Sequence, residues 1–258
     1  MERITDYSKS QPIVELYTAI QSEGSRAGYP HFVVRTTGCT HRCYFGQGGW
    51  CDTWYTSIHP SKGKFSLADV KAYFEAHPEI THIMITGGSP TMHPELVNEI
   101  IHIGKEMRDM FVTIETEGSH FIKTDIPIDL VSLSPKFSNS VPQLGTKTPK
   151  GMDVDQKLID QHNKHRLAIE EVRKSLDYHK DYHYKPVIGK ENPELWDEIE
   201  AFRVELNIPK NKTWVMPAGD TREAVIPNYA YCLDECIKRG YNFTGRAHIV
   251  AFDDKREV

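Results

Sequence analysis

Short apolar runs alternate with amphipathic segments along the first half of this 258-residue chain. The apolar runs predict strands at residues 12–20, 31–37, 81–86, 111–115 and 130–134. The amphipathic segments predict helices over residues 67–77 and 94–107, the first of them with Ser66 as N-cap and Asp69 in the capping-box position. Strands that alternate with helices indicate a parallel sheet with crossover helices, in a full or partial barrel.

The second half of the chain is less regular. Residues 138–165 are rich in polar and turn residues and predict a loop or excursion. Further helices are expected at residues 166–179, 193–206 and 229–239, the last ending at Gly240, and further strands at residues 184–188, 213–216 and 247–252. For this length we expect a single α/β domain of residues 1–258.

Composition and charge narrow the range of partners. The formal charge of -5 and the pI near 6.2 leave no basic excess for binding phosphate backbones, so nucleic acid is not expected. No run approaches the roughly 18 apolar residues of a membrane span, and the polar start lacks the order of a signal peptide. A cytoplasmic protein is therefore expected, in which five cysteines indicate a metal or catalytic site rather than disulfides.

Three of the cysteines, Cys39, Cys43 and Cys51, lie close together in the sequence. Their thiolates can bind three irons of a 4Fe-4S cluster and leave the fourth iron free for a substrate or cofactor. With His41 or His59 as a fourth ligand, they can instead form a structural zinc site. The spacing alone leaves both interpretations open.

A glycine pair provides a second signal. Gly87-Gly88-Ser89-Pro90 follows a predicted strand, where glycines let the backbone approach a ligand closely. Alone, this pair is typical of a strand-to-helix turn. Together with the cysteine loop it resembles the radical S-adenosylmethionine superfamily, which carries a three-cysteine loop after one barrel strand and a Gly-Gly-Glu-Pro-like motif after the next. Ser89 replaces the usual glutamate of that motif.

Further motifs, in the same order along nearly the whole chain, resemble the 7-carboxy-7-deazaguanine synthase family of this superfamily. They are Ile-Gln-Ser-Glu-Gly at 20–24, Arg-Thr-Thr-Gly-Cys at 35–39, Cys-Asp-Thr at 51–53, Thr-Gly-Gly-Ser-Pro at 86–90, Glu-Thr-Glu-Gly at 115–118, Ser-Pro-Lys at 134–136, Arg-Ala-His at 246–248 and Lys-Arg-Glu-Val at 255–258.

Two features depart from the family pattern. Seven residues rather than two separate Cys43 from Cys51, and Gly46, Gly48 and Gly49 give this long loop flexibility. We still expect all three cysteines to be ligands. The polar excursion after Ser-Pro-Lys is also longer than in the family, and it is expected either to cover the site or to be a surface elaboration.

The resemblance implies a fold, an activity and a set of cofactors. The fold is an incomplete (β/α) barrel, and the activity is the conversion of 6-carboxy-5,6,7,8-tetrahydropterin to 7-carboxy-7-deazaguanine with loss of ammonia, in 7-deazapurine (queuosine-type) biosynthesis. The reaction uses a 4Fe-4S cluster, S-adenosylmethionine and Mg2+. An external electron donor such as flavodoxin or ferredoxin and a homodimeric assembly are also expected.

The resemblance also implies roles for individual residues. The cluster ligands are Cys39, Cys43 and Cys51, and Thr53 offers a hydroxyl oxygen to Mg2+. Residues expected to contact the cofactor are Trp50, Cys51, Asp52, Gly88, Ser134, Pro135, Lys136, Met216, Pro217, Ala218 and Gly219. Residues expected to contact the substrate are Ala19, Ile20, Gln21, Glu23, Arg35, Thr86, His248 and Val258.

The chemistry of these side chains suits the roles, but some of them have structural alternatives. Gln21 and Glu23 can hydrogen-bond the edge of a pterin, and Arg35 can grip a carboxylate with two parallel bonds. Alternatively, Arg35 forms a structural salt bridge, and His248 is a satisfied core residue of the final strand.

Two rival functions remain at this point. A glycyl-radical activating enzyme shares the cluster and the cofactor but acts on a protein, which leaves the polar substrate-side residues unexplained. A non-enzymatic binding module stapled by zinc would hold one zinc ion and cleave no cofactor.

Overall fold

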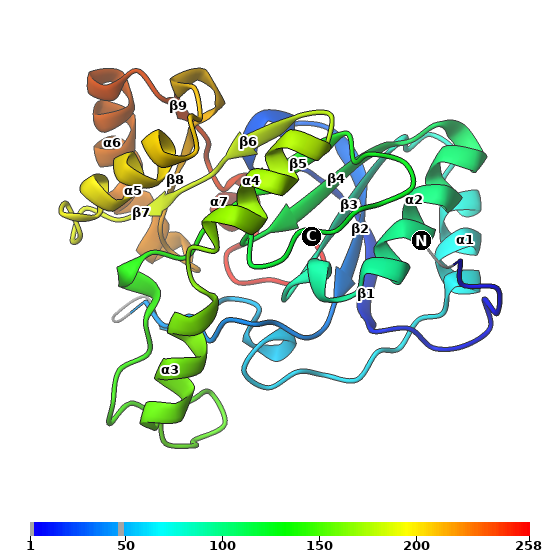
Figure 1. Ribbon diagram of the computed structural model, residues 1–258, viewed down its shortest axis with the longest axis horizontal. Helices are drawn as coiled ribbons and strands as arrows, with labels where there is room; N and C mark the ends of the chain where they lie inside the picture. Colours follow the sequence, from blue (N-terminus) through cyan, green and yellow to red (C-terminus); the bar gives the residue numbers. More distant parts are fainter. Residues whose placement is uncertain (1–2, 46–48) are drawn as a thin grey trace.

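The computed structural model describes residues 3–45 and 49–258, arranged as in Figure 1. The helices are α1 (Leu67–Ala76), α2 (Pro94–Arg108), α3 (Gln156–His165), α4 (Ile169–Tyr178), α5 (Leu195–Glu205), α6 (Arg222–Arg239) and α7 (Ala247–Phe252). The strands are β1 (Ile13–Ile20), β2 (Pro30–Thr36), β3 (His82–Gly87), β4 (Phe111–Thr116), β5 (Leu130–Leu133), β6 (Tyr182–Tyr184), β7 (Val187–Ile188), β8 (Trp214–Pro217) and β9 (Asn242–Phe243). Among the described residues, no helix has the length and apolar composition needed to cross a membrane.

Two sheets form the frame of the molecule. In the first, β1 to β6 pair in chain order, with β1 antiparallel to β2 and all other neighbours parallel. In the second, β7, β8 and β9 are parallel, and a bridge between Tyr184 and Thr213 joins the two sheets. Within the described part of the chain the strands do not close into a ring, so the predicted incomplete barrel is confirmed.

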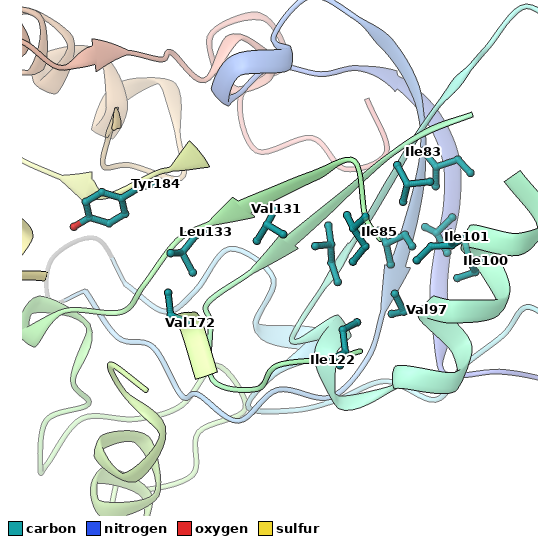
Figure 2. Close-up of a cluster of buried hydrophobic side chains, with 14 of the residues drawn as sticks. Ile83, Ile85, Val97, Ile100, Ile101, Ile122, Val131, Leu133, Val172 and Tyr184 are labelled. Atoms are coloured by element: carbon teal, nitrogen blue, oxygen red, sulfur yellow. The ribbon is translucent and has the colours of Figure 1, made fainter. Parts of the chain in front are cut away.

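An apolar stripe on α2 covers one face of the first sheet. Val97, Ile100 and Ile101 are fully buried and lie against Ile83 and Ile85 of β3, as Figure 2 shows. The spacing of three and four residues places these side chains on one face of the helix. Burial of each contributes about 1.5–3 kcal/mol. This core holds the parallel strands whose carboxyl ends carry the candidate site.

The predicted ends of two helices are confirmed. Ser66 Oγ accepts a hydrogen bond from Asp69 N at 3.2 Å, and the Asp69 carboxylate accepts one from Ser66 N at 2.7 Å. This is the predicted capping box of α1. Helix α6 ends at Gly240, whose φ of +71° lies in the left-handed region that favours glycine.

The predicted final strand at residues 247–252 is wrong, because this segment forms helix α7. Six apolar residues fit either a strand or a short helix, and periodicity cannot separate the two. In the structure Val250 N donates to Arg246 O at 3.1 Å, as in a helix, and only Ile249 of the run is fully buried. His248 therefore lies in the first turn of a helix and not on a strand.

Three other boundaries differ from the prediction. The excursion contains helix α3, whose first turn is capped by the Asp155 carboxylate. Helix α6 begins at Arg222, seven residues earlier than expected, because the Thr221 hydroxyl caps it and the helix tolerates Pro227. The single strand expected at residues 184–188 is two short strands, which are interrupted at Pro186 because proline has no N–H to donate.

Because two histidines are buried, we expect the free energy of unfolding to decrease in acid. The His179 ring accepts a hydrogen bond from Ile128 N at 3.2 Å, and the His183 ring contacts Ser25 and Ser132. Burial lowers the pKa of His179 to about 4 and the pKa of His183 to about 3. Below about pH 6.5 the unfolded chain binds protons that the folded chain does not. The stabilisation is thus complete above pH 6.5 and decreases as the pH falls toward 4.

We expect each histidine to contribute a slope of about 1.4 kcal/mol per pH unit to the free energy of unfolding between about pH 6 and pH 4.5. Urea unfolding of the metal-free protein across this range measures the slope. H179N and H183N should each make it shallower, whereas H120N, which changes an exposed histidine, should leave it unchanged. An identical slope in all four proteins would contradict the prediction.

Candidate active site

A cavity of about 800 Å³ opens at the carboxyl ends of the parallel strands. Its wall includes residues at or directly after the ends of five strands: Gly87, Thr116, Ser134, Lys185 and Ala218. Because parallel strands present these ends on one side of a sheet, the side chains that follow them converge on a single space.

The cysteine loop follows β2 and folds into a hairpin. Tyr44 and Trp50 form an antiparallel bridge, and Cys51 N donates to Cys43 O at 3.1 Å. This pairing brings Cys43 and Cys51 together although seven residues separate them in the sequence. Both cysteines line the cavity, and so does Cys39. The unusual spacing is therefore compatible with three ligands on one wall.

The three cysteines are free thiols. Burial is the main cause that raises the pKa of Cys39, Cys43 and Cys51 above the ordinary value. The metal-free protein therefore holds neutral thiols, and iron has to displace their protons when it binds. Gly46 and Gly48, which were expected to make this loop flexible, lie outside the described residues.

The described side chains form no compact site for a single metal ion. Across residues 3–45 and 49–258, no three His, Cys, Asp or Glu side chains converge closely enough to hold one metal ion. A structural zinc site requires such convergence. His59, one of the possible zinc ligands, instead contacts Thr148 Oγ1 at 3.0 Å. Cys39, Cys43 and Cys51 all line the cavity wall, so a 4Fe-4S cluster held by their three thiolates would face the cavity.

The glycine pair after β3 packs against the entry to the cysteine loop. A Cβ atom on Gly87 would lie 2.2 Å from Thr36 O, and a Cβ on Gly88 would lie 2.2 Å from Gly38 O. Neither position has room for a side chain. Ser89 N also donates to Gly38 O at 2.8 Å, which ties the two loops together. Gly88 lines the cavity, so a ligand there meets bare backbone.

Alternating charges surround Glu23 in the cavity wall. Glu23 pairs with Lys185 Nζ at 2.5 Å and with Arg246 Nε at 3.0 Å. Lys185 also pairs with Glu115 at 3.0 Å, and Arg246 Nη2 pairs with Asp52 at 2.8 Å. Each of these five charges therefore has a neighbour of opposite sign, which offsets the cost of removing it from water.

The pairing keeps these groups ionised. Burial opposes the charge of Glu23, but Lys185 and Arg246 outweigh it and hold the pKa of Glu23 far below its usual range. Burial likewise opposes the charge of Lys185, but Glu115 and Glu23 raise its pKa. Nearby His248 has a pKa lowered by burial, so this ring is neutral at pH 7. Glu23 is thus an anionic acceptor held in place by two cations.

Gln21 and Arg35 line the cavity but also have structural contacts. Arg35 Nε donates to Glu15 Oε2 at 2.5 Å and Arg35 Nη2 donates to Tyr17 OH at 3.3 Å, so the structural salt bridge is present. Gln21 Oε1 accepts a hydrogen bond from Ser22 N at 2.9 Å and shapes the turn after β1. Nη1 of Arg35 takes part in neither contact. Both N–H groups of Nη1 and the second N–H of Nη2 remain to donate to a ligand carboxylate.

Most of the remaining residues expected at the site lie in the cavity wall. They are Ala19, Ile20, Trp50, Thr53, Thr86, Lys136, Met216, Gly219, His248 and Val258. Pro135 and Pro217, which were expected beside the cofactor, are not part of the wall. The structure brings the predicted segments together, and the roles of the individual residues stay predictions.

Glu115, Lys185 and Arg246 were not among the predicted site residues. Glu115 and Arg246 belong to motifs that the resemblance had already identified, so the signal was present. Lys185 directly follows β6, and a polar residue at the end of a parallel strand is a good candidate for a site. The prediction of one strand across residues 184–188 obscured that position.

The excursion at residues 138–165 forms hydrogen bonds with the cysteine hairpin. Its helix α3 projects from the main body of the molecule (Figure 1). Arg42 N donates to His162 Nδ1 at 3.0 Å, and Trp50 Nε1 donates to Lys147 O at 2.8 Å. Burial lowers the pKa of His162 to about 3, so the ring remains a neutral acceptor. The excursion therefore covers the hairpin rather than being only a surface elaboration.

Comparison with known proteins gives consistent results along the chain. Residues 33–136 match the model of the family described as Radical SAM superfamily. A 7-carboxy-7-deazaguanine synthase from Halobacterium salinarum is 30% identical over 256 residues, which cover 96% of this chain and 92% of the relative. The 7-carboxy-7-deazaguanine synthase of Rhodopirellula baltica is 29% identical over 246 residues, with coverage of 95% and 87%.

Solved structures support the fold. The crystal structure of QueE from Escherichia coli aligns with a TM-score of 0.56 at 21% identity and covers 91% of this chain and 92% of that chain. Streptococcus suis SuiB, bound to precursor peptide SuiA, aligns with a TM-score of 0.51 at 16% identity, over 83% of this chain and 47% of that chain. At these identities the likeness concerns the arrangement of strands and helices.

The hydrogen bond from Arg42 N to His162 Nδ1 can be tested in the metal-free protein. We expect H162A to leave Arg42 N without an acceptor and to open the hairpin more often, which should raise the rate of thiol modification in the metal-free protein about tenfold. H165A changes a histidine on the same helix that does not contact the hairpin backbone and should leave the rate unchanged. Equal rates in wild type and H162A would show that His162 does not stabilise the cysteine hairpin.

Proposed function

Because this chain belongs to the 7-carboxy-7-deazaguanine synthase family, we propose that it converts 6-carboxy-5,6,7,8-tetrahydropterin to 7-carboxy-7-deazaguanine with loss of ammonia. The observation that carries the proposal is the placement of three cysteine thiols and the alternating charges around Glu23 on the wall of one cavity. A small molecule can contact both regions at once.

One region suits the cofactors of the superfamily. Cys39, Cys43 and Cys51 would hold three irons of a 4Fe-4S cluster, and Gly88 offers bare backbone beside them. When bound, the reduced cluster and S-adenosylmethionine supply the radical that removes a hydrogen atom from the substrate. Lys136, which donates to Ser134 Oγ at 3.1 Å, and Gly219 line the same space as further contacts for the polar groups of the cofactor.

The other region suits the substrate. The carboxylates of Glu23 and Glu115 can accept N–H groups from the edge of a pterin, because each carboxylate oxygen accepts more than one hydrogen bond. Lys185 joins the two carboxylates and limits their rotation before the substrate arrives, which lowers the entropic cost of binding. Gln21, Thr86 and the neutral ring of His248 complete a polar wall suited to a heterocycle.

Thr53 is the proposed Mg2+ ligand. Its hydroxyl lies in the cavity wall, 3.3 Å from Cys51 Sγ, and a hydroxyl oxygen is a ligand type that Mg2+ accepts. Asp52 is a weaker candidate, because one of its oxygens already pairs with Arg246. When bound, the ion would offset the negative charge of the substrate carboxylate.

Two further parts of the proposal concern partners. Cofactor cleavage consumes an electron, so a one-electron donor such as flavodoxin or ferredoxin has to reduce the cluster. A homodimer is proposed from the resemblance to the family.

The activity is tested with the chain reconstituted anaerobically with iron and sulfide. After addition of dithionite, S-adenosylmethionine, Mg2+ and the carboxy-tetrahydropterin, we expect 7-carboxy-7-deazaguanine and ammonia, detected by chromatography with mass spectrometry. C51A should lose both cluster iron and turnover, whereas C232A, which changes a buried cysteine away from the cavity, should keep both. Formation of deoxyadenosine without the deazaguanine acid would reject the substrate but keep the superfamily chemistry.

If Thr53 is a Mg2+ ligand, its removal should weaken Mg2+ binding, and a serine hydroxyl at the same position should restore it. We expect T53A to raise the Mg2+ concentration for half-maximal activity roughly tenfold, because an oxygen ligand is lost, and T53S to restore it. Titration of Mg2+ at saturating substrate measures the effect. An unchanged titration curve for T53A would exclude Thr53 as a ligand.

A further inference from the structure

Glu117 is a buried carboxylate beside the cysteine loop that the proposed reaction has not yet used. It directly follows β4, lines the cavity and is only 8% exposed. Its Oε1 accepts hydrogen bonds from Ser89 Oγ at 2.6 Å and Thr40 Oγ1 at 3.2 Å, and also from Ser119 Oγ. Its Oε2 is shielded from water and has no hydrogen-bond partner among the described residues.

No lysine or arginine among the described residues forms an ion pair with Glu117. In the part of the chain that the structure describes, its one ion-pair contact is His41 Nδ1 at 3.8 Å. Burial opposes ionisation of Glu117, but His41 and the hydroxyl donors outweigh it and hold its pKa below the usual value. A buried carboxylate oxygen without a donor is costly, which points to a ligand.

The hydrogen bonds bring this carboxylate beside the residue that replaces the motif glutamate. Ser89 stands at the position of the motif glutamate, and its hydroxyl donates to Glu117. Thr40, the residue after Cys39, donates to the same oxygen. The carboxylate therefore reaches the junction of the cysteine loop and the glycine loop from the end of β4 rather than from position 89.

We propose that Glu117 binds the amino group of S-adenosylmethionine, in place of the glutamate that Ser89 replaces. The amino nitrogen donates an N–H to the free carboxylate oxygen, while Ser89, Thr40 and Ser119 hold the other oxygen. The terminal torsion of a glutamate is broad, so a small rotation of the carboxylate presents Oε2 to the cavity. This inference rests on the cofactor of the proposed function but not on its substrate.

The first test measures cofactor affinity without turnover. The reconstituted, unreduced protein is titrated with S-adenosylmethionine by anaerobic equilibrium dialysis. We expect E117Q to weaken binding roughly 10- to 100-fold, because the charge-assisted hydrogen bond is lost while shape is kept. E235Q, which makes the same exchange on α6 at a residue outside the cavity wall, should bind like the wild type.

The second test exchanges the two side chains. In S89E/E117S the glutamate returns to the motif position, and the total side-chain volume is unchanged. We expect this double variant to regain most of the affinity that E117Q loses. The electron paramagnetic resonance spectrum of the reduced cluster should respond to S-adenosylmethionine at similar concentrations in the wild type and the double variant, and only at higher concentrations in E117Q.

A purely structural role predicts other results. It predicts that E117Q loses iron and melts earlier, whereas the binding role predicts retained iron and an unchanged or raised melting temperature, because an unpaired buried charge is removed. Wild-type affinity in E117Q would overturn the proposal, and so would a folded, iron-loaded double variant that binds no better than E117Q. If the wild type binds the cofactor but does not convert the pterin, the proposed substrate fails and the role of Glu117 stands.

Discussion

The pairing of Glu23 with Lys185 and Arg246 is the interaction on which the geometry of the cavity depends. Glu23 lies in the turn after β1, Lys185 follows β6, and Arg246 precedes α7. Segments that are far apart in the sequence therefore meet at one carboxylate. The strands leave the barrel open, and these ion pairs connect its two sides. Loss of one partner would leave a buried charge without compensation.

At the same cavity, the cysteine hairpin and the glycine loop are held together by a different kind of contact. Gly87 and Gly88 approach the backbone of Thr36 and Gly38 too closely for any side chain, so the fit is steric rather than electrostatic. The result is one wall built from backbone and thiols and another built from paired charges. Such a division suits a reaction in which a cofactor and a polar heterocycle have to lie side by side.

Local patterns in the sequence were sufficient for much of the fold. The capping box at Ser66, the helix from Pro94 and the stop at Gly240 depend on neighbouring residues, and all three are confirmed. The run at residues 247–252 was misread, because only the packing of Ile249 decides between helix and strand there. Short apolar runs carry too little periodicity to specify their own conformation.

The site residues that belong to sequence motifs could be predicted. The site residues that are defined by ion pairs between distant parts of the chain could not. The cysteines, the glycine pair and the substrate-side turn can be located by residue type and order. The partners of Glu23 cannot, because ion pairs across more than a hundred residues of chain leave no local pattern. Lys185 and Glu117 became visible only through their neighbours in space.

Because Tyr44 and Trp50 pair in a hairpin, the number of residues between Cys43 and Cys51 does not determine how far apart these two cysteines lie. Once antiparallel pairing returns the chain to Cys51, residues added at the tip lengthen the loop without separating the sulfurs. The count of residues between the second and third cysteine is then free to drift during evolution, while the pairing register is not. Searches for related chains that demand a fixed interval will overlook proteins built in this way.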